Sequence, residues 1–307
     1  MLILASRPNA YTGSPLDRAS ERRDDDAWIA ARLEDPSSLF APTWQAKSLL
    51  RGVEAGTPEA VFLDGGAAEA VRMSGGPWAF LGMMQDRAVF AVDLSASEDP
   101  LPLLPSGLGT FTDLRAVAGL LPPGDASMLA HARGLMHWRT RTRFCGVCGA
   151  ACEPRSAGNV MQCPSCNAQH FPRTDPAVIM LVVHGDSCLL GHSHRFPNVS
   201  MYSTLAGFVE PGESLEEAVA REVAEETSVR VGTVRYHSSQ PWPFPASIML
   251  GFYAVAETTA IRIDPAELKD ARWFTREELR NHAALGFSLP RVDSIARRLI
   301  EDWIAAG

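Results

Sequence analysis

Cysteine spacing offers the clearest chemistry in this sequence. The chain holds six cysteines, and five of them lie within the span from Cys145 to Cys166. Four of these form two Cys-x2-Cys pairs, Cys145/Cys148 and Cys163/Cys166, with 14 residues between the pairs. Thiolate sulfur is a preferred ligand of Zn²⁺, and four such ligands complete its tetrahedral coordination. The pattern predicts a closed, structural zinc site; redox chemistry of the pairs and chance clustering are the alternatives.

The two remaining cysteines are not expected to bind the metal. Cys152 lies inside the cluster, where it is either a reserve ligand or an inert small side chain, and we favour the second interpretation. Cys188 lies in an apolar stretch, and a free cysteine in such a place usually packs as a small hydrophobic residue.

A second candidate site lies on a predicted helix over residues 214–227, which is rich in glutamate. At helical periodicity, Glu222, Glu225 and Glu226 fall on the face that begins at Leu215 as an apolar stripe. Carboxylates directed toward the protein interior are unfavourable, and the carboxyl end of a helix is already negative. A bound divalent cation would offset both effects, and oxygen ligands suit Mg²⁺ or Mn²⁺. The alternative is a solvated acidic face with ordinary ion pairs, such as Glu217–Arg221 and Arg221–Glu225.

A proline-rich aromatic segment follows this helix. It reads Ser239-Gln240-Pro241-Trp242-Pro243-Phe244-Pro245-Ala246-Ser247. Proline fixes φ, so Trp242 and Phe244 are presented on a stiff backbone and lose little entropy when a flat ring stacks on them. Gln240 and Ser247 could donate or accept hydrogen bonds at either end. The alternative is a hydrophobic connector whose aromatic rings pack in a core.

The surrounding elements indicate how these candidates are positioned. Helices are predicted over 127–140, 214–227, 275–282 and 290–304, and the pairs Ser214/Glu217 and Thr275/Glu278 have capping-box spacing. Strands are predicted over 61–63, 88–94, 178–183, 187–190, 202–209, 229–237 and 248–255, with turns at 64–66 and 74–77 and a loop over 99–109. Because strands and helices intermix, we expect an α/β fold with a mixed sheet flanked by helices.

We divide the chain into three ranges. Residues 1–125 are expected to form a small mixed α/β domain of unclear role. Residues 126–172 form a linker helix and a zinc ribbon, and residues 173–307 form the domain that carries the acidic helix.

Composition narrows the class of protein. The formal net charge is −8, which argues against a general nucleic-acid binder, although a basic stretch over 139–143 could contact RNA phosphates or be an ordinary solvated surface. No apolar run approaches the roughly 20 residues of a membrane helix, and the start of the chain lacks the features of a signal peptide. A cytoplasmic protein without a membrane anchor is expected.

The acidic helix resembles a known motif. Gly207, Glu213 and the segment Arg221-Glu222-Val223-x-Glu225-Glu226 have the spacing of the Nudix box of the Nudix hydrolases. In the usual box a glycine stands where this chain has Ser228. This one departure from the Nudix-box pattern lies at the C-terminal end of the helix. The resemblance implies a mixed-sheet α/β/α sandwich (α+β) that hydrolyses a nucleoside diphosphate linked to another moiety. It further implies that Glu222, Glu225 and Glu226 act as metal ligands or base, that Glu213 orients Arg221, and that the Ala206 carbonyl contacts the metal.

Two further features place the resemblance within one subfamily. The segment SQPWPFPxS after the box, and a four-cysteine zinc module before the catalytic domain, are similar to those of the NADH pyrophosphatase (NudC-like) subfamily. The resemblance covers about residues 130–307. It implies that residues 240–247 bind substrate, that Glu267 is a further metal ligand, and that Phe171 and Ala296 contact substrate. A glutamate that relatives carry in the zinc module falls on Gly158, so that contact is expected to be absent.

The expected function follows from this resemblance. It is the Mg²⁺- or Mn²⁺-dependent hydrolysis of NADH or NAD⁺ to (reduced) nicotinamide mononucleotide and AMP, by a homodimer that also removes NAD caps from RNA. The alternatives are a Nudix hydrolase of ADP-ribose or of a dinucleoside polyphosphate, and a zinc-ribbon nucleic-acid-binding protein whose Nudix domain is inactive.

Overall fold

The computed structural model describes residues 8–196 and 200–307, which form two compact units. The first unit contains the described residues of Met1–Ala10, Asp175–Pro241 and Ser247–Gly307. The second unit contains Tyr11–Thr174 and Trp242–Ala246, so the tip of one hairpin belongs to a different unit from most of its two strands. The division into the ranges 1–125, 126–172 and 173–307 stays a prediction.

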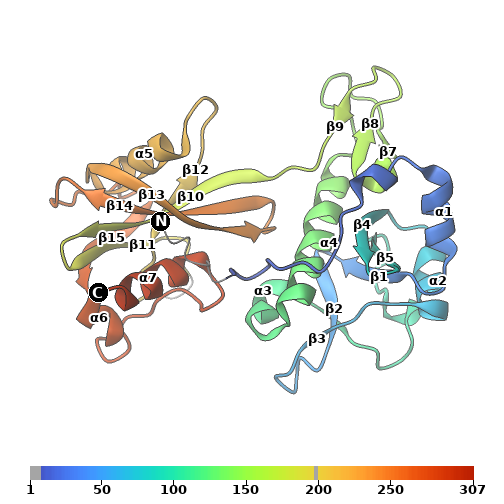
Figure 1. Cartoon of the computed structure of the whole chain (residues 1–307), viewed down its shortest axis with the longest axis horizontal. Helices are drawn as coiled ribbons and strands as arrows, with labels where there is room; N and C mark the ends of the chain where they lie inside the picture. The colour runs from blue at the N-terminus through green and yellow to red at the C-terminus, as the bar shows by residue number, and fades with distance from the viewer. Residues whose placement is uncertain (1–7, 197–199) are drawn as a thin grey trace. The chain divides into compact units, whose positions relative to one another are not determined.

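The first unit is built on a six-stranded mixed sheet (Figure 1). Its strands are β10 (Asp175–His184), β11 (Ser187–Ser193), β12 (Leu205–Phe208), β13 (Val231–Trp242), β14 (Ser247–Ala256) and β15 (Leu268–Thr275). The order is β13-β14-β10-β11-β15, with β12 also pairing with β10. Strands β10 and β14 run parallel, while β11 and β12 pair with β10 in the antiparallel sense. The unbroken apolar run of β10 is typical of a strand that is covered on both faces.

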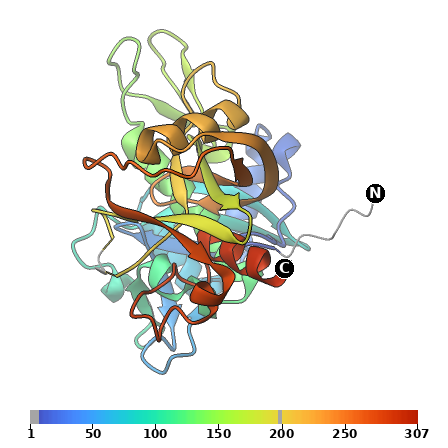
Figure 2. The same cartoon turned by 90° about the vertical axis from the view of Figure 1, so that its left-hand side faces the viewer.

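Helices cover both faces of this sheet (Figures 1 and 2). They are α5 (Leu215–Thr227), α6 (Arg276–Arg280) and α7 (Ile295–Ala305). Because side chains alternate along a strand, Val178 and Met180 pack in the core under α5, and Ile179 and Leu181 pack in the core under α7. The expected α/β/α sandwich is therefore confirmed.

The predicted elements of this unit need corrections at their ends. The strand expected over 202–209 pairs regularly only at Leu205–Phe208, and the strand expected over 229–237 extends to Trp242. The helix expected over 275–282 is only five residues long, although the Thr275/Glu278 capping box is present. The last helix begins at Ile295 and not at residue 290, because Ser294 accepts the Arg297 N–H and so provides the N-cap.

The second unit contains a six-stranded sheet with its own core. Its strands are β1 (Leu39–Trp44), β2 (Lys47–Arg51), β3 (Glu59–Ala60), β4 (Trp78–Met84), β5 (Arg87–Asp93) and β6 (Thr110–Thr112). Its helices are α1 (Asp26–Glu34), α2 (Gly65–Met73), α3 (Leu114–Val117) and α4 (Pro123–Arg141). The order is β3-β2-β1-β5-β4, with β6 pairing with β2, and β1 runs parallel to β5.

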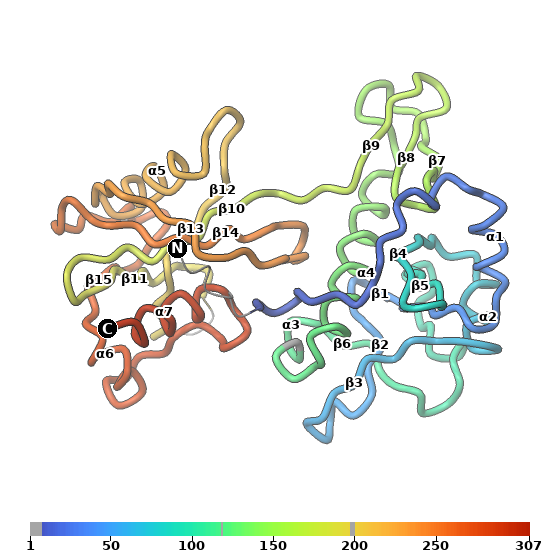
Figure 3. The backbone as a smooth tube through the Cα atoms, in the orientation of Figure 1, coloured from blue at the N-terminus to red at the C-terminus, as the bar shows by residue number. Residues whose placement is uncertain are grey.

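A three-stranded ribbon follows α4 in the same unit. Its strands are β7 (Glu153–Arg155), β8 (Val160–Gln162) and β9 (Gln169–His170). From β9 the chain runs on into β10 of the first unit (Figure 3). No helix of the described residues is both long and apolar enough to cross a membrane.

Two predictions for the second unit are wrong. The turn expected over 64–66 is the start of α2, because Ala68 and Val71 bury one face of a helix that begins at Gly65. The strand expected over 61–63 is absent, and only Leu63 makes an isolated bridge, to Phe40. The strand over 88–94, the turn over 74–77 and the helix over 127–140 are present, the last as part of α4. The loop over 99–109 contains a short 3-10 helix, Leu101–Leu103.

The exit of α5 generates a stability prediction. Ser228 caps the helix in the left-handed region, with φ 60° and ψ 8°, and this conformation costs a non-glycine residue about 1 kcal/mol. Its hydroxyl also donates a hydrogen bond to the Arg262 carbonyl, at 3.1 Å. We expect Ser228→Gly to raise the free energy of unfolding by about 0.5–1 kcal/mol and Ser228→Ala to lower it, as measured by urea unfolding. A Gly variant less stable than the wild type would show that the Arg262 contact outweighs the backbone strain.

Candidate active site and zinc centre

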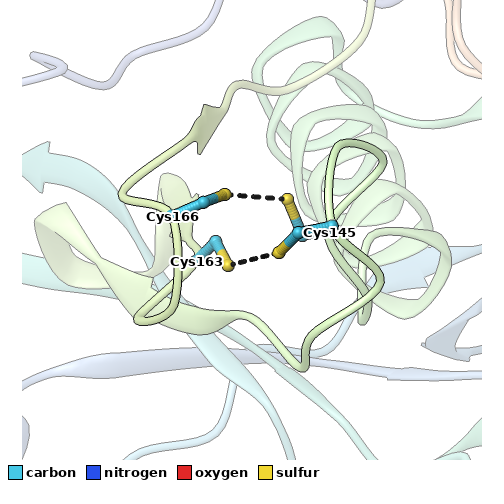
Figure 4. A group of neighbouring side chains, drawn as sticks. Cys145, Cys163 and Cys166 are labelled. Carbon is cyan, nitrogen blue, oxygen red and sulfur yellow. Dashed lines mark hydrogen bonds between the residues drawn. The ribbon is translucent and has the colours of Figure 1, made fainter.

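Two tight turns bring the four paired cysteines together (Figure 4). In each turn the first cysteine donates its backbone N–H to the alanine five residues later, over 2.8 Å at Cys145 and 2.9 Å at Cys163. The Sγ atoms of Cys145 and Cys166 are 3.7 Å apart, and those of Cys148 and Cys163 are 3.4 Å apart. Zinc–sulfur bonds of about 2.3 Å imply tetrahedron edges of about 3.8 Å. The four sulfurs therefore fit a zinc ion.

The protonation of these thiols also indicates a cation. Backbone N–H groups of Cys148 and Val147 lower the pKa of Cys145 to about 6. The Ala168 N–H lowers the pKa of Cys166, but the neighbouring sulfurs of Cys148 and Cys163 raise it. The net effect is a pKa of about 12. Four thiolates cannot ionise together at this spacing without a positive charge among them. The donor set thus needs the ion that its geometry accommodates.

The other cysteines occupy different environments. Cys152 is half-buried next to the cluster, and burial is the main cause of its raised pKa, followed by the charges of Cys145, Cys163 and Cys148. Cys188 is fully buried in β11, and burial raises its pKa to about 12, which makes it the inert packing residue that the sequence predicts.

The acidic helix α5 brings two glutamates to the sheet. Its Ser214/Glu217 capping box is present as expected. Glu222 and Glu226 are one helical turn apart, so they point the same way, and both are buried despite their charge. Glu267, exposed and directly before β15, completes a group in which one carboxylate oxygen of each residue lies within 4.8 Å of the others. This is the arrangement of a divalent cation site with oxygen ligands.

Gly207 on β12 makes room for this group. A Cβ at this position would lie 1.8 Å from the Glu222 carboxyl carbon, which is far inside contact distance. Only glycine can therefore stand here while Glu222 keeps its place. The next residue back, Ala206, donates its backbone N–H to the Glu226 carboxylate.

Arg221 connects the remaining glutamates of the motif. Its guanidinium holds Glu213 in a bidentate ion pair of 2.6 and 2.8 Å, as the sequence predicts. It also donates to Glu222 at 2.9 Å and to Glu225 at 3.0 Å. Arg221 is the main reason that the pKa of Glu213 falls to about 2. Glu225 is exposed and lies outside the carboxylate group of Glu222, Glu226 and Glu267.

Electrostatics within the carboxylate group favours a bound cation. Burial, and then the charges of Glu267 and Glu222, raise the pKa of Glu226 to about 8. Burial also raises the pKa of Glu222, although Arg221 opposes this. Without a cation the group is therefore unfavourable in its charged form, and the residues fit a divalent metal ion.

The aromatic segment is divided between the two units. In the first unit Gln240 is completely buried: its amide oxygen accepts the Ile295 N–H at 2.9 Å, and its amide nitrogen donates to the Asp293 carbonyl at 2.8 Å. Its side chain is therefore already occupied at the start of α7. Ala296, the neighbour of Ile295, is buried there too.

The rings of the segment lie in the second unit. Trp242 and Phe244 are half-buried, with their ring centroids 5.2 Å apart and both edge-on to Tyr11. Pro243 is buried and Pro245 is exposed, while Pro241, Ala246 and Ser247 are half-buried. Phe171 is 62% exposed directly after β9. In the basic stretch, Arg139 is half-buried and donates to the Trp78 carbonyl, whereas Arg141 and Arg143 are exposed.

Sequence reasoning missed the contacts that fix this segment. Tyr11 and Arg133 touch the rings from positions more than 100 residues away, and neither carries a local motif.

Gly158 has φ +83°, and a Cβ there would lie 2.5 Å from the Trp78 carbonyl oxygen, which explains why this chain has no side chain at that position.

We expect zinc content to depend on the four paired cysteines alone. Cys163→Ser should lose the ion and the hydrogen-exchange protection of residues 143–171, because the ribbon strands are too short to fold without it. Cys152→Ser, the matched control within the cluster, should keep about one zinc per chain. Elemental analysis measures the zinc, and equal zinc contents in the two variants would contradict the assignment.

The raised pKa of Glu226 predicts a pH-dependent stability. An unfolded glutamate loses its proton near pH 4.5, whereas the folded state without a divalent metal keeps it up to about pH 8. The folded state is therefore destabilised as pH rises between these values, by about 1.4 kcal/mol for each unit of pKa difference. In buffer free of Mg²⁺ and Mn²⁺, we expect Glu226→Gln to be more stable than the wild type at pH 8.5, with a smaller difference at pH 5. Urea unfolding measures this, exposed Glu216→Gln is the control, and an equal difference at both pH values would contradict it.

Comparison with known proteins finds three family models that match successive parts of the chain. Family models match a NUDIX domain over residues 173–297, an NADH pyrophosphatase-like rudimentary NUDIX domain over 37–138, and an NADH pyrophosphatase zinc ribbon domain over 140–171. Among solved structures, a NUDIX hydrolase from Nitrosomonas europaea is 20% identical with a TM-score of 0.40, and covers 48% of this chain and 97% of its own.

Sequence relatives extend beyond the Nudix domain. The NAD-capped RNA hydrolase NudC of Stutzerimonas stutzeri is 42% identical over 226 residues, which are 73% of this chain and 76% of that protein. The human NAD-capped RNA hydrolase NUDT12 is 45% identical over 194 residues, 59% of this chain; the match spans only 42% of that protein's length. The chain belongs to the Nudix hydrolase family, in the NudC-type group that combines an NADH pyrophosphatase-like rudimentary domain and a zinc ribbon with a Nudix domain.

Proposed function

We propose that this chain hydrolyses the diphosphate linkage of NADH and NAD⁺, giving (reduced) nicotinamide mononucleotide and AMP, and that it cleaves the same linkage in NAD-capped RNA. The observation that carries the proposal is the carboxylate group of buried Glu222 and Glu226 and exposed Glu267, beside Gly207. Two relatives named as NAD-capped RNA hydrolases, at 42% and 45% identity, support the choice of substrate.

The carboxylate group would hold the catalytic metal. Mg²⁺ or Mn²⁺ bound there would neutralise the diphosphate oxygens and lower the pKa of the attacking water. Glu222, Glu226 and Glu267 would be the side-chain ligands, with the Ala206 carbonyl as a further contact. Burial of Glu222 and Glu226 excludes bulk water from one side of the site, which strengthens electrostatic interactions within it.

The remaining residues of the box have other roles in this proposal. Glu225 lies outside the carboxylate group and is the candidate for accepting the proton of the attacking water. The Arg221–Glu213 pair fixes the arginine that donates to both Glu222 and Glu225, and so orients them. The Arg221 donation to the Phe208 carbonyl, at 2.9 Å, ties this network to β12.

Substrate recognition is assigned to the aromatic segment and to two residues outside it. Trp242 and Phe244 would stack on a flat ring of the substrate, and the prolines on either side keep the backbone stiff. Phe171 and Ala296 are further proposed contacts, as the subfamily resemblance implies. Gln240 would act through the buried hydrogen bonds that hold the start of α7.

The assembly and the cellular location also follow from the resemblance. We propose a homodimer, because members of the subfamily build the substrate site from two chains. A cytoplasmic location agrees with the cysteine-rich metal site, since reducing conditions keep such thiols free to bind zinc.

We test the function with one chromatographic assay of NADH, NAD⁺, ADP-ribose and a dinucleoside polyphosphate, each with Mg²⁺ or Mn²⁺. The wild type should release AMP and reduced nicotinamide mononucleotide from NADH. Glu226→Gln and Gly207→Ala should each lower kcat by about 100-fold or more, the first by removing a charged ligand and the second by displacing Glu222. Glu216→Gln, on an exposed face of α5, should change nothing.

The assay also separates the alternatives. Preferential cleavage of ADP-ribose would keep the Nudix chemistry and reject the role of the aromatic segment. If the protein cleaves none of the four compounds and no NAD-capped RNA, the hydrolase function is rejected. That result would favour a binding protein with an inactive Nudix domain.

A further inference from the structure

The aromatic segment is held by one arginine of helix α4. The guanidinium of Arg133 donates a hydrogen bond to the Pro243 carbonyl and lies over the ring of Phe244, with Cζ 4.5 Å from the ring centroid. The adjacent Gly134 lets the helix approach, because a Cβ there would lie 3.3 Å from Pro243 Cβ. Positions 133 and 134 together therefore fix both the backbone and one ring of the segment.

Arg133 also brings a positive charge to Phe244 without forming an ion pair of its own among the described residues. A second cation, Arg115, has its Cζ 5.4 Å from the same ring, but it forms an ion pair of 2.6 Å with Asp113. Arg133 forms no ion pair with any residue that the structure describes, and its Nε is buried without a hydrogen-bond partner. The attraction between its charge and the ring is strong because the cation is partly desolvated.

This charge affects which flat ring can stack on the segment. The π face of an aromatic ring attracts a cation, and the ring of Phe244 already interacts with the guanidinium of Arg133. A second positive charge brought to the segment would be repelled by Arg133 across a few ångströms of partly buried protein. An uncharged ring of the same size would stack without that penalty. Reduced and oxidised nicotinamide are such a pair, since they share a carbon–nitrogen skeleton and only the oxidised ring carries a positive charge.

We propose that Arg133 is the specificity-determining residue of this loop: it positions Phe244 and, through its charge, makes the loop accept an uncharged nicotinamide ring in preference to a cationic one. This inference rests on the proposed function, in which the aromatic segment receives the nicotinamide end of the dinucleotide. It gives the rudimentary domain, through α4, a role in substrate choice.

The experiment compares kcat/KM for NADH and NAD⁺ in the full-length protein and three variants. Arg133→Met removes the charge at similar length, and Arg133→Lys keeps it. Arg139→Met is the matched control, because Arg139 also lies on α4, also donates to a backbone carbonyl, that of Trp78, and also has a buried Nε. Thermal unfolding and zinc content establish that each variant is folded.

We expect the wild type to favour NADH by about tenfold, as a repulsion between two partly buried charges predicts. Arg133→Met should bring the NADH to NAD⁺ ratio close to one, mainly through KM. Arg133→Lys and Arg139→Met should keep the wild-type ratio. A purely structural role of Arg133 would lower both activities equally and leave the ratio unchanged.

The outcomes separate this inference from the function on which it rests. Cleavage of NADH by the wild type, with an unchanged ratio in Arg133→Met, would overturn the inference alone. The same shift of ratio in Arg139→Met would also overturn it, because the effect would then belong to α4 in general. Absence of cleavage of both dinucleotides by the wild type would reject the proposed function, and the inference with it.

Discussion

The desolvation of two glutamates is the constraint on which the first unit depends. Glu222 and Glu226 are turned toward the sheet on the last two turns of α5, where both burial and the helix dipole oppose a negative charge. Glu222 can take its position only because Gly207 leaves room for its carboxyl group directly against β12. The surrounding apolar core under α5, which includes Val219 and Val223, holds the helix in place despite these charges.

The polar contacts around the carboxylates offset part of the free-energy cost of burying the charges of Glu222 and Glu226. Arg221 neutralises part of the charge of Glu222 from the side, and it is itself held by the bidentate pair with Glu213. Glu267 reaches the same place from the loop before β15, and the backbone N–H of Asp264 in that loop donates to the Glu226 carbonyl. The sheet, the helix and this loop thus meet at one cluster of oxygen atoms, an arrangement that a divalent cation would stabilise.

The rudimentary domain repeats part of this architecture without its chemistry. Both sheets contain one parallel strand pair, β1 with β5 and β10 with β14. Helix α2 carries a single acidic residue, the exposed Glu69, where α5 carries five. Within residues 8–196 and 200–307, two groups of side chains are arranged to bind a metal ion: the four paired cysteines, and Glu222, Glu226 and Glu267 of the first unit. What the second unit does provide is packing for the rings of the aromatic segment, through Tyr11 and through Arg133 on α4.

The sequence by itself determined the sites whose residues are close along the chain. The two Cys-x2-Cys pairs, the Ser214/Glu217 cap and the glutamates one turn apart on α5 are all defined by local geometry, since tight turns and helical periodicity bring such residues together wherever the chain goes. Local patterns were less reliable at element ends, as the start of α2 and the late start of α7 show, because packing of Ala68 and capping by Ser294 decide those boundaries.

Only the tertiary structure decided which of the glutamates share one site and what the aromatic segment touches. Glu225 is exposed and lies outside the group of Glu222, Glu226 and Glu267, and Gln240 is buried in hydrogen bonds at α7. Arg133 donates to the Pro243 carbonyl across a sequence separation of 110 residues. Contacts of this kind arise when separate elements pack against one another, so no periodicity or spacing in the sequence records them.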